Sequence, residues 1–124
     1  MTSQYPMLID GEWVSATDNC WFDSYEPGTG EVWARVAAAT EVDVDRAVRA
    51  ADRAMHSGPW SKMTASERGE ALGRLGELVG RHATVLAEAE TRDTGKLIRE
   101  TAGSVAYVPA FYRYYGGLAD KIQG

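Results

Sequence analysis

The sequence has very few of the residues that form disulfides or bind transition metals. Its 124 residues include one cysteine, Cys20, and two histidines, His56 and His82. A single cysteine cannot form a disulfide within the chain, and neither histidine lies at metal-ligand spacing from it. Cys20 lies in a polar stretch without a neighbouring base or helix start to activate its thiol. We therefore expect neither a zinc site nor a nucleophilic cysteine.

Long apolar runs are also missing. No stretch approaches the ~20 consecutive apolar residues that cross a bilayer, and residues 1–6 lack the basic and apolar regions of a signal peptide. The composition, 44% hydrophobic and 25% charged, is that of a soluble globular protein about one domain long. We therefore expect a cytoplasmic protein with no membrane partner.

Positive charge is scarce relative to negative charge. Lys and Arg number 13 against 18 Asp and Glu, which gives a formal net charge of -5. The basic residues are scattered among acidic ones, whereas proteins that bind nucleic acid cluster basic side chains to neutralise phosphates. We therefore expect no nucleic-acid partner.

What is present begins with signals for short strands. The dipeptide Asp10-Gly11 separates two apolar runs and tolerates the positive φ angles of a tight turn, which predicts a β-hairpin over residues 7–14. Residues 21–25 have an extended pattern that stops at a dense turn signal. Residues 32–36 alternate apolar side chains with larger exposed ones, as in a half-buried strand.

From Thr40 onward, the apolar spacing becomes that of helices. Thr40 with Asp43, and Thr64 with Glu67, have the spacing of capping boxes, which mark helix starts. The first helix is predicted to end near residue 57 and the second to continue towards residue 89. Glycines weaken a helix, so those in the second helix predict close packing of another element against them. These glycines are Gly73, Gly76 and Gly80.

A third helix is predicted from residue 97 to Gly124, with Pro109 inside it. Five of its residues fall roughly on one side: Leu97, Thr101, Val105, Val108 and Tyr112. Its aromatic cluster is interpreted as core, and consists of Tyr107, Phe111, Tyr112, Tyr114 and Tyr115.

Together these signals predict an α+β fold in which a β-hairpin and short strands precede three helices. We expect a flexible N-terminus over residues 1–6, an entry hairpin and short strands over residues 7–37, and a three-helix segment over residues 38–124. The helices carry more apolar surface than a few short strands can cover. We therefore expect exposed apolar patches, and either an oligomer or association with something larger.

The turn Asp93-Thr94-Gly95-Lys96 admits three interpretations. Aspartic proteases present a catalytic carboxylate on an Asp-Thr-Gly loop between strands, but the flanking residues here are charged and helix-forming. A phosphate cradle requires Gly-x-x-x-x-Gly-Lys-Ser/Thr after an apolar strand, and only Gly95-Lys96 matches it. The favoured interpretation is a helix C-terminal turn, with Gly95 in the left-handed conformation and Asp93 or Thr94 capping the next helix.

Read in order, several motifs resemble the opening portion of the NAD(P)-dependent aldehyde dehydrogenase superfamily, most closely its broad-specificity and betaine-aldehyde-like members. Leu8-Ile9-Asp10-Gly11-Glu12-Trp13-Val14 resembles the entry hairpin of that family, and the turn over residues 26–32 resembles its Asn-Pro-x-Thr-Gly-Glu motif, with Glu26 for Asn. The resemblance continues at family spacing over residues 42–48, 58–63, 66–69, 93–96 and 113–121.

The resemblance implies that this chain is part of the α/β aldehyde dehydrogenase fold. Such enzymes oxidise an aldehyde to a carboxylic acid with NAD or NADP. They use a catalytic cysteine, a glutamate base, an oxyanion-binding asparagine and a Rossmann-like domain. Cys20 does not match the family's Gly-Gln-x-Cys setting, and no glycine-rich βα turn is present. We therefore expect no catalytic or cofactor-binding residue among these 124, and no NAD or NADP bound by this chain alone.

Two candidate sites follow from the resemblance. Ser24, Tyr25 and Asp93 match positions that help to form a monovalent-cation site for Na+ or K+, for which carboxylate and carbonyl oxygens are suitable ligands. A second set matches the helix that lines the mouth of the substrate tunnel: Gly103, Tyr107 and Phe111.

Two functional hypotheses remain at this point. The first is the N-terminal segment of an aldehyde dehydrogenase, whose helices pack against the cofactor domain and against subunits of a homo-oligomer. The alternative is a non-catalytic, truncated or split interaction module that docks through exposed helix faces.

Overall fold

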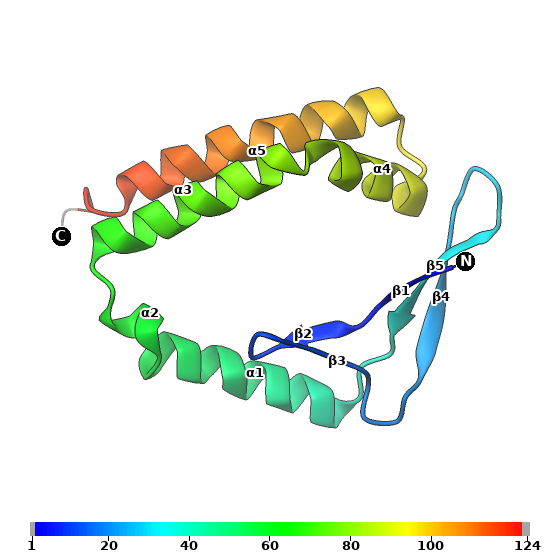
Figure 1. Ribbon diagram of the computed structural model, residues 1–124, viewed down its shortest axis with the longest axis horizontal. Helices are drawn as coiled ribbons and strands as arrows, with labels where there is room; N and C mark the ends of the chain where they lie inside the picture. The colour runs from blue at the N-terminus through cyan, green and yellow to red at the C-terminus, as the bar shows by residue number, and fades with distance from the viewer. Residues whose placement is uncertain (1, 123–124) are drawn as a thin grey trace. The chain divides into compact units, whose positions relative to one another are not determined.

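The computed structural model describes residues 2–122 (Figure 1). The chain divides into two compact units, residues 1–61 and residues 62–124, which are described one at a time. Their order, strands first and helices after, confirms the predicted α+β organisation.

The first unit contains two small sheets. Strand β5 (Val32–Ala37) pairs antiparallel with β4 (Trp21–Tyr25) and parallel with β1 (Ser3–Tyr5). Strands β2 (Met7–Ile9) and β3 (Glu12–Val14) form the predicted hairpin. Its turn is built as the dipeptide predicts, because Asp10 and Gly11 have φ angles of 57° and 81°.

Strand β1 lies inside residues 1–6, which were expected to be flexible. Its three residues show no apolar alternation, and its partner β5 lies far along the chain. A parallel pairing of this kind needs a long connection, so local sequence patterns do not reveal it.

Helix α1 (Glu41–His56) completes the first unit and begins at Thr40 as predicted, with both hydrogen bonds of the capping box. The side chains that turn inward are small or polar, with Asp43 and Ala50 buried. The larger apolar side chains of α1 lie at helical spacing but are exposed in this unit, since Val44, Val48 and Met55 each keep more than half of their accessible surface.

The second unit contains more helices than predicted. A short helix, α2 (Pro59–Lys62), contains the boundary between residues 61 and 62. The helices after it are α3 (Ala65–Arg81), α4 (Ala83–Thr94) and α5 (Ile98–Leu118). The Thr64 and Glu67 capping box is present at the start of α3. The single helix predicted over residues 64–89 is interrupted at His82, which ends α3 and precedes α4. The apolar spacing continues across this break, so periodicity could not locate it.

Helix α5 ends at Leu118 and does not continue to Gly124 as predicted; residues 123–124 lie outside the described part. Gly116 and Gly117, poor helix formers, immediately precede its end. The expected inner side of α5 is correct for most positions: Thr101 and Val105 are buried, while Val108 and Tyr112 are half-buried. No helix among residues 2–122 is long and apolar enough to cross a membrane.

Glycines bring α3 and α5 together, and the two helices run side by side in opposite directions (Figure 1). A Cβ on Gly69 would overlap the carbonyl oxygen of Gly116, so the two backbones touch at this crossing. A Cβ on Gly76 would lie 3.1 Å from Tyr112 Cβ, whereas one on Gly73 would meet nothing within 4 Å. The prediction of close packing is thus right for Gly76 and for Gly80, where a Cβ would lie 3.4 Å from Pro109 Cγ, and wrong for Gly73. The closest approach lies at Gly69.

Candidate functional site

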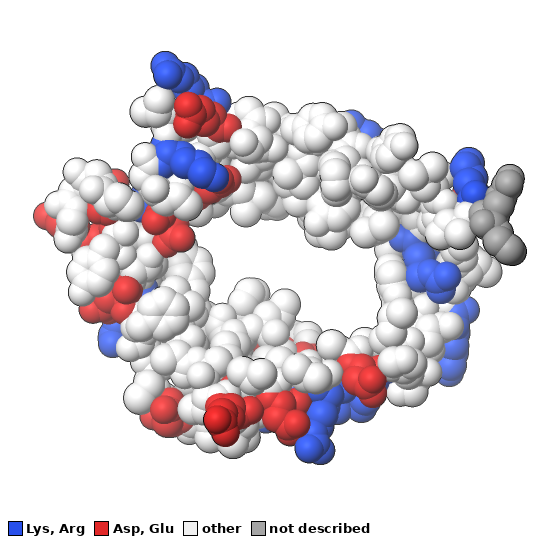
Figure 2. Space-filling view, turned by 180° about the vertical axis from the view of Figure 1, so that it is seen from behind, with Lys and Arg blue, Asp and Glu red and all other residues white. Residues whose placement is uncertain are grey.

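The outer face of α5 carries a run of aromatic side chains without charge. Residues 101–112 contain no charged side chain. Gly103, Tyr107 and Phe111 follow one another at intervals of four, which places them on one face of the helix. Tyr107 is 67% exposed and Phe111 49% exposed. Figure 2 shows that few charged side chains cover the middle of the α3 and α5 pair.

Two further tyrosines extend this face into a shallow cleft of about 380 Å³, lined by Tyr107, Ala110, Phe111, Tyr114 and Tyr115. The ring of Tyr115 lies 4.6 Å from that of Phe111 and 5.2 Å from that of Tyr114, between centroids. These tilted and edge-to-face contacts hold the rings in a defined arrangement. Such a surface can bind flat or apolar groups.

The interpretation of the aromatic cluster as core was therefore wrong for four of its five members. Tyr112 alone turns partly inward, where its Cβ lies against Gly76. Helical spacing contained part of the signal for this division: Tyr112 follows the inner Thr101, Val105 and Val108, whereas Tyr107 and Tyr114 fall on the opposite side. Tyr115 lies seven positions after Val108 and has the spacing of an inner residue, so spacing alone does not predict its exposure.

The expected cation ligands come from both units. In the first unit, Ser24 Oγ accepts a hydrogen bond from the Trp33 indole N–H at 3.1 Å. Tyr25 is exposed and lies where the pairing of β4 and β5 shifts register. In the second unit, Asp93 lies in the last turn of α4 and is exposed. The meeting of these residues around one ion stays a prediction.

The turn after α4 confirms the favoured interpretation of its glycine. Gly95 has φ 74° and ψ 6°, the left-handed conformation, and its N–H donates to the Thr91 carbonyl at 2.9 Å. Because the loop lies between two helices, it lacks the strand context of a protease loop or a phosphate cradle. Lys96 Nζ lies 2.7 Å from Glu90 Oε1, and this hydrogen bond raises the pKa of Lys96.

The expectation that Asp93 or Thr94 caps the next helix was wrong. Helix α5 has Leu97 as its N-cap residue, with no capping side chain. Thr94 Oγ1 donates to the Glu90 carbonyl at 2.6 Å and accepts from the Lys96 N–H at 3.3 Å. Gly95, Lys96 and Leu97 separate Thr94 from the first turn of α5, which places its hydroxyl too early in the chain to cap that turn.

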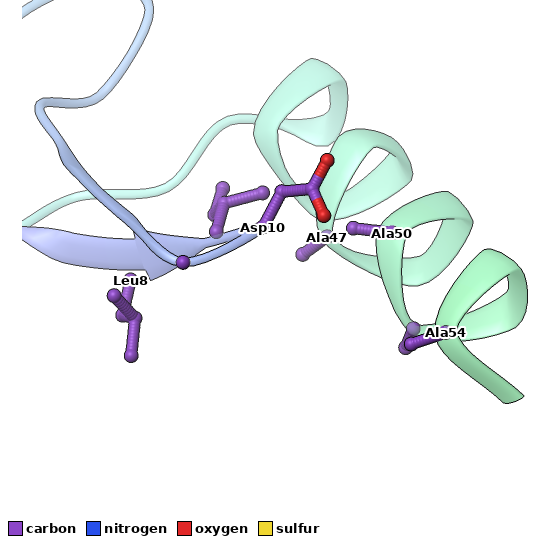
Figure 3. A pocket seen from close by; sticks show the side chains of 8 residues that line it. Leu8, Asp10, Ala47, Ala50 and Ala54 are labelled. Carbon is purple, nitrogen blue, oxygen red and sulfur yellow. The ribbon is translucent and has the colours of Figure 1, made fainter. Parts of the chain in front are cut away.

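A second hollow lies in the first unit, between the hairpin turn and α1 (Figure 3). Its volume is about 370 Å³, and it is lined mainly by small apolar side chains of α1 and by the turn. Asp10 turns towards α1, where its carboxylate lies 3.0 Å from Arg53 Nη2. The lining residues labelled in the figure are Leu8, Asp10, Ala47, Ala50 and Ala54.

The surroundings of Cys20 do not activate its thiol. The Cys20 thiol is exposed, and its hydrogen bond to Asp18 raises its pKa, which disfavours the nucleophilic thiolate. Within residues 2–122, no group of three His, Cys, Asp or Glu side chains is placed to hold a metal ion.

Comparison with known proteins decides the family. The sequence profile of the aldehyde dehydrogenase family matches residues 13–124. The chain belongs to the aldehyde dehydrogenase family. Among its relatives, (Z)-2-((N-methylformamido)methylene)-5-hydroxybutyrolactone dehydrogenase of Acinetobacter baylyi is 48% identical over 121 residues, which cover 98% of this chain and 24% of the relative. Mitochondrial aldehyde dehydrogenase of Equus caballus is 43% identical over 95% of this chain and 24% of its own.

Solved structures of this family share the fold along the whole chain. An NAD-dependent aldehyde dehydrogenase from Sinorhizobium meliloti superposes with a TM-score of 0.95 at 32% identity, covering 100% of this chain and 25% of that one. The NAD+ complex of a Bacillus cereus aldehyde dehydrogenase gives 0.94 at 39% identity, covering 98% and 25%. The chain therefore corresponds to the N-terminal portion of an aldehyde dehydrogenase and spans about a quarter of the length of these relatives. These matches favour the dehydrogenase hypothesis over the separate interaction module.

Proposed function

We propose that these residues form the N-terminal scaffold of an enzyme that oxidises an aldehyde to a carboxylic acid with NAD or NADP. In that reaction a hydride leaves the aldehyde carbon for the nicotinamide, and water supplies the oxygen of the acid. The observation that carries the proposal is the likeness of both units, over the full chain, to an NAD-dependent aldehyde dehydrogenase. The 124 residues supply structure and substrate contacts, while the nucleophile, base and dinucleotide site come from other residues of the enzyme.

The outer face of α5 has the properties of a wall along which an aldehyde enters. Tyr107 and Phe111 offer exposed aromatic surface, and a side chain at Gly103 would meet nothing within 4 Å, so this position leaves room beside them. The absence of charge over residues 101–112 favours an uncharged or apolar aldehyde chain over an anionic one.

We propose from the family resemblance that Ser24, Tyr25 and Asp93 each contribute an oxygen ligand to a monovalent cation. Ser24 and Tyr25 offer backbone carbonyls and Asp93 a carboxylate, and hard ions such as Na+ and K+ prefer these ligands. The chain would supply part of the coordination, and later residues of the enzyme the remainder.

The remainder of the enzyme is the expected cover for the exposed apolar faces, with further copies in a homo-oligomer. Large side chains outside the aromatic cleft, such as Trp13, Val48 and Val85, are each more than 60% exposed. Exposed apolar surface of this extent marks a surface that is covered in the working protein.

A chimera tests the proposed function. Residues 1–124 replace the matching quarter of the Bacillus cereus aldehyde dehydrogenase, and NADH formation from an aldehyde is followed by absorbance. We expect turnover by the chimera and none by the purified 124-residue chain. NADH formation by the chain alone, or a folded chimera without activity, would contradict the proposal.

The same chimera tests the aromatic wall. Phe111→Ala is expected to raise KM for an apolar aldehyde more than it lowers kcat, because it removes binding surface and no reacting group. Phe22→Ala on strand β4 is the matched control, since Phe22 is 53% exposed and Phe111 49%. Equal changes in KM for the two substitutions would contradict a role of α5 in binding the aldehyde.

A further inference from the structure

The first unit buries a carboxylate where a core would normally bury apolar groups. Asp43 is 0% exposed and is its largest fully buried side chain. Burying a charge is costly unless hydrogen bonds replace the lost water, so the contacts of Asp43 must compensate for this cost. Among described residues of this unit, the buried apolar side chains are Ile9 and small alanines: Ala16, Ala34, Ala37 and Ala50.

Four hydrogen bonds reach the Asp43 carboxylate from two places in the chain. Thr40 donates its N–H at 2.9 Å and its hydroxyl at 2.8 Å to Oδ2, as part of the capping box. Thr17 lies 26 positions away in the chain and donates its N–H to Oδ2 at 3.1 Å and its hydroxyl to Oδ1 at 2.6 Å. One carboxylate therefore starts a helix and holds a distant loop.

The loop that Thr17 belongs to, residues 15–20, is called the strap here because it joins β3 of the hairpin to β4 of the sheet. Ala16 is 2% exposed, and its carbonyl accepts from the Asn19 N–H at 2.8 Å. The Cys20 carbonyl accepts from the Ala38 N–H at 2.9 Å. The strap thus touches the sheet at its end and α1 at its centre.

We propose that Asp43 is a latch that fixes the strap to the start of α1, so that hairpin, sheet and helix keep one arrangement without a large apolar core. The latch acts within this chain, so it operates whether or not the proposed enzymatic activity is correct. The hydrogen bond from the Thr17 hydroxyl, followed by those from Thr40 and the Thr17 N–H, holds the pKa of Asp43 well below its usual range. Arg46 on the same helix faces the carboxylate at 3.9 Å.

Hydrogen exchange of the 124-residue chain tests the latch. Asp43→Asn keeps the shape but replaces one acceptor oxygen with a donor that faces the Thr17 and Thr40 donors. We expect exchange in the strap and at residues 40–44 to accelerate about tenfold or more, as for the loss of a hydrogen bond to a charged group. Asp45→Asn is the matched control: it removes the same charge two residues away, from an exposed carboxylate paired with Arg49 at 2.8 Å.

A second pair of variants separates the latch from the helix cap. Thr17→Val removes the hydroxyl donor of the strap and leaves the Thr40 capping box intact, whereas Thr17→Ser keeps the donor. We expect Thr17→Val to accelerate exchange in the strap with little change at residues 40–44, and Thr17→Ser to resemble the wild type.

The exchange rates of the strap in these variants decide whether Asp43 holds it. Equal strap exchange in Asp43→Asn and Asp45→Asn would overturn it. If Asp43→Asn does not fold, the Thr17 pair decides: faster strap exchange in Thr17→Val than in Thr17→Ser supports the latch, and equal exchange overturns it.

Discussion

In the first unit the largest fully buried side chain is the carboxylate of Asp43, whereas in the second it is the hydroxyl-bearing Thr101. Asp43 connects the strap to the start of α1 through donors far apart in sequence. Thr101 contacts Thr91 at 2.8 Å between hydroxyl oxygens, so it joins α4 to α5. The first unit is organised around a charge, and the second around helix contacts that include the backbone touch of Gly69 and Gly116.

The difference shows two ways in which a segment can hold a shape while leaving its apolar faces exposed. Neither unit has many large buried apolar side chains, and both expose valines, leucines or aromatic rings. Hydrogen bonds and close backbone contacts specify geometry, whereas the exposed apolar surface remains available for burial against other parts of the enzyme. This arrangement agrees with a scaffold that is completed by the rest of an aldehyde dehydrogenase.

The largest loss of stability is expected in the second unit, where Gly69 contacts Gly116. Gly69→Ala should lower the free energy of unfolding by about 1–3 kcal/mol, because its Cβ meets the Gly116 carbonyl, which belongs to the backbone and cannot turn away. Gly73→Ala in the same helix is the control and should raise stability by up to about 1 kcal/mol, since its Cβ has open space. Urea unfolding followed by circular dichroism measures both. Equal effects would mean that the crossing is not tight.

An effect of similar size is expected at the buried hydroxyl pair. Thr101→Val should cost about 1–3 kcal/mol, because Thr91 loses its buried partner and the Ile98 carbonyl loses a donor. The double variant Thr91→Val with Thr101→Val should cost less than the sum of the single variants. Unfolding midpoints in urea test this, and strict additivity would show that the two hydroxyls act independently.

The two capping boxes allow a direct comparison between the units. Thr64→Ala should cost about 1 kcal/mol, as is usual for an exposed N-cap threonine. Thr40→Ala should cost more, because the hydroxyl it removes also hydrogen-bonds a fully buried carboxylate. All four tryptophans lie in residues 1–61, so tryptophan fluorescence reports the first unit and hydrogen exchange of α3 the second. A larger loss for Thr64→Ala would contradict the comparison.

The smallest effect expected near neutral pH is the pH dependence of the stability that Asp43 contributes, which changes only in acid. The pKa of Asp43 is lowered in the folded chain, so its stabilisation is present above the ordinary Asp pKa of about 3.9 and is lost as the pH falls through the folded value. The stability difference between wild type and Asp43→Asn should be constant between about pH 7 and about pH 5, and shrink below about pH 4. Tryptophan fluorescence during thermal unfolding measures it. A stability difference between wild type and Asp43→Asn that grows as the pH falls would contradict a lowered pKa of Asp43 in the folded chain.

Local chemistry made part of this structure predictable. The Asp10-Gly11 turn, both capping boxes and the left-handed Gly95 each depend on a few adjacent residues, and all were predicted correctly. The pairing of β1 with β5 depends on residues distant in sequence, and no local pattern marks it. The break at His82 was hidden because the apolar spacing continues across it.

The aromatic cleft on α5 was predictable only in part. Family resemblance singled out Tyr107 and Phe111, whose role in the substrate tunnel stays a prediction, whereas the contribution of Tyr114 and Tyr115 to the same cleft required the ring geometry. The capping role of Asp43 followed from its spacing to Thr40, whereas its bond to Thr17 could not, because the strap is brought to α1 by the fold.

The exposed apolar faces provide the most direct test of the scaffold proposal. The fluorescence of a hydrophobic dye is measured with the purified 124-residue chain and with the same residues inside the active chimera, alongside the size of each species. We predict strong dye binding or self-association by the chain alone, and weak dye binding once the remainder of the enzyme covers these faces. A monodisperse chain that binds no dye would contradict the account.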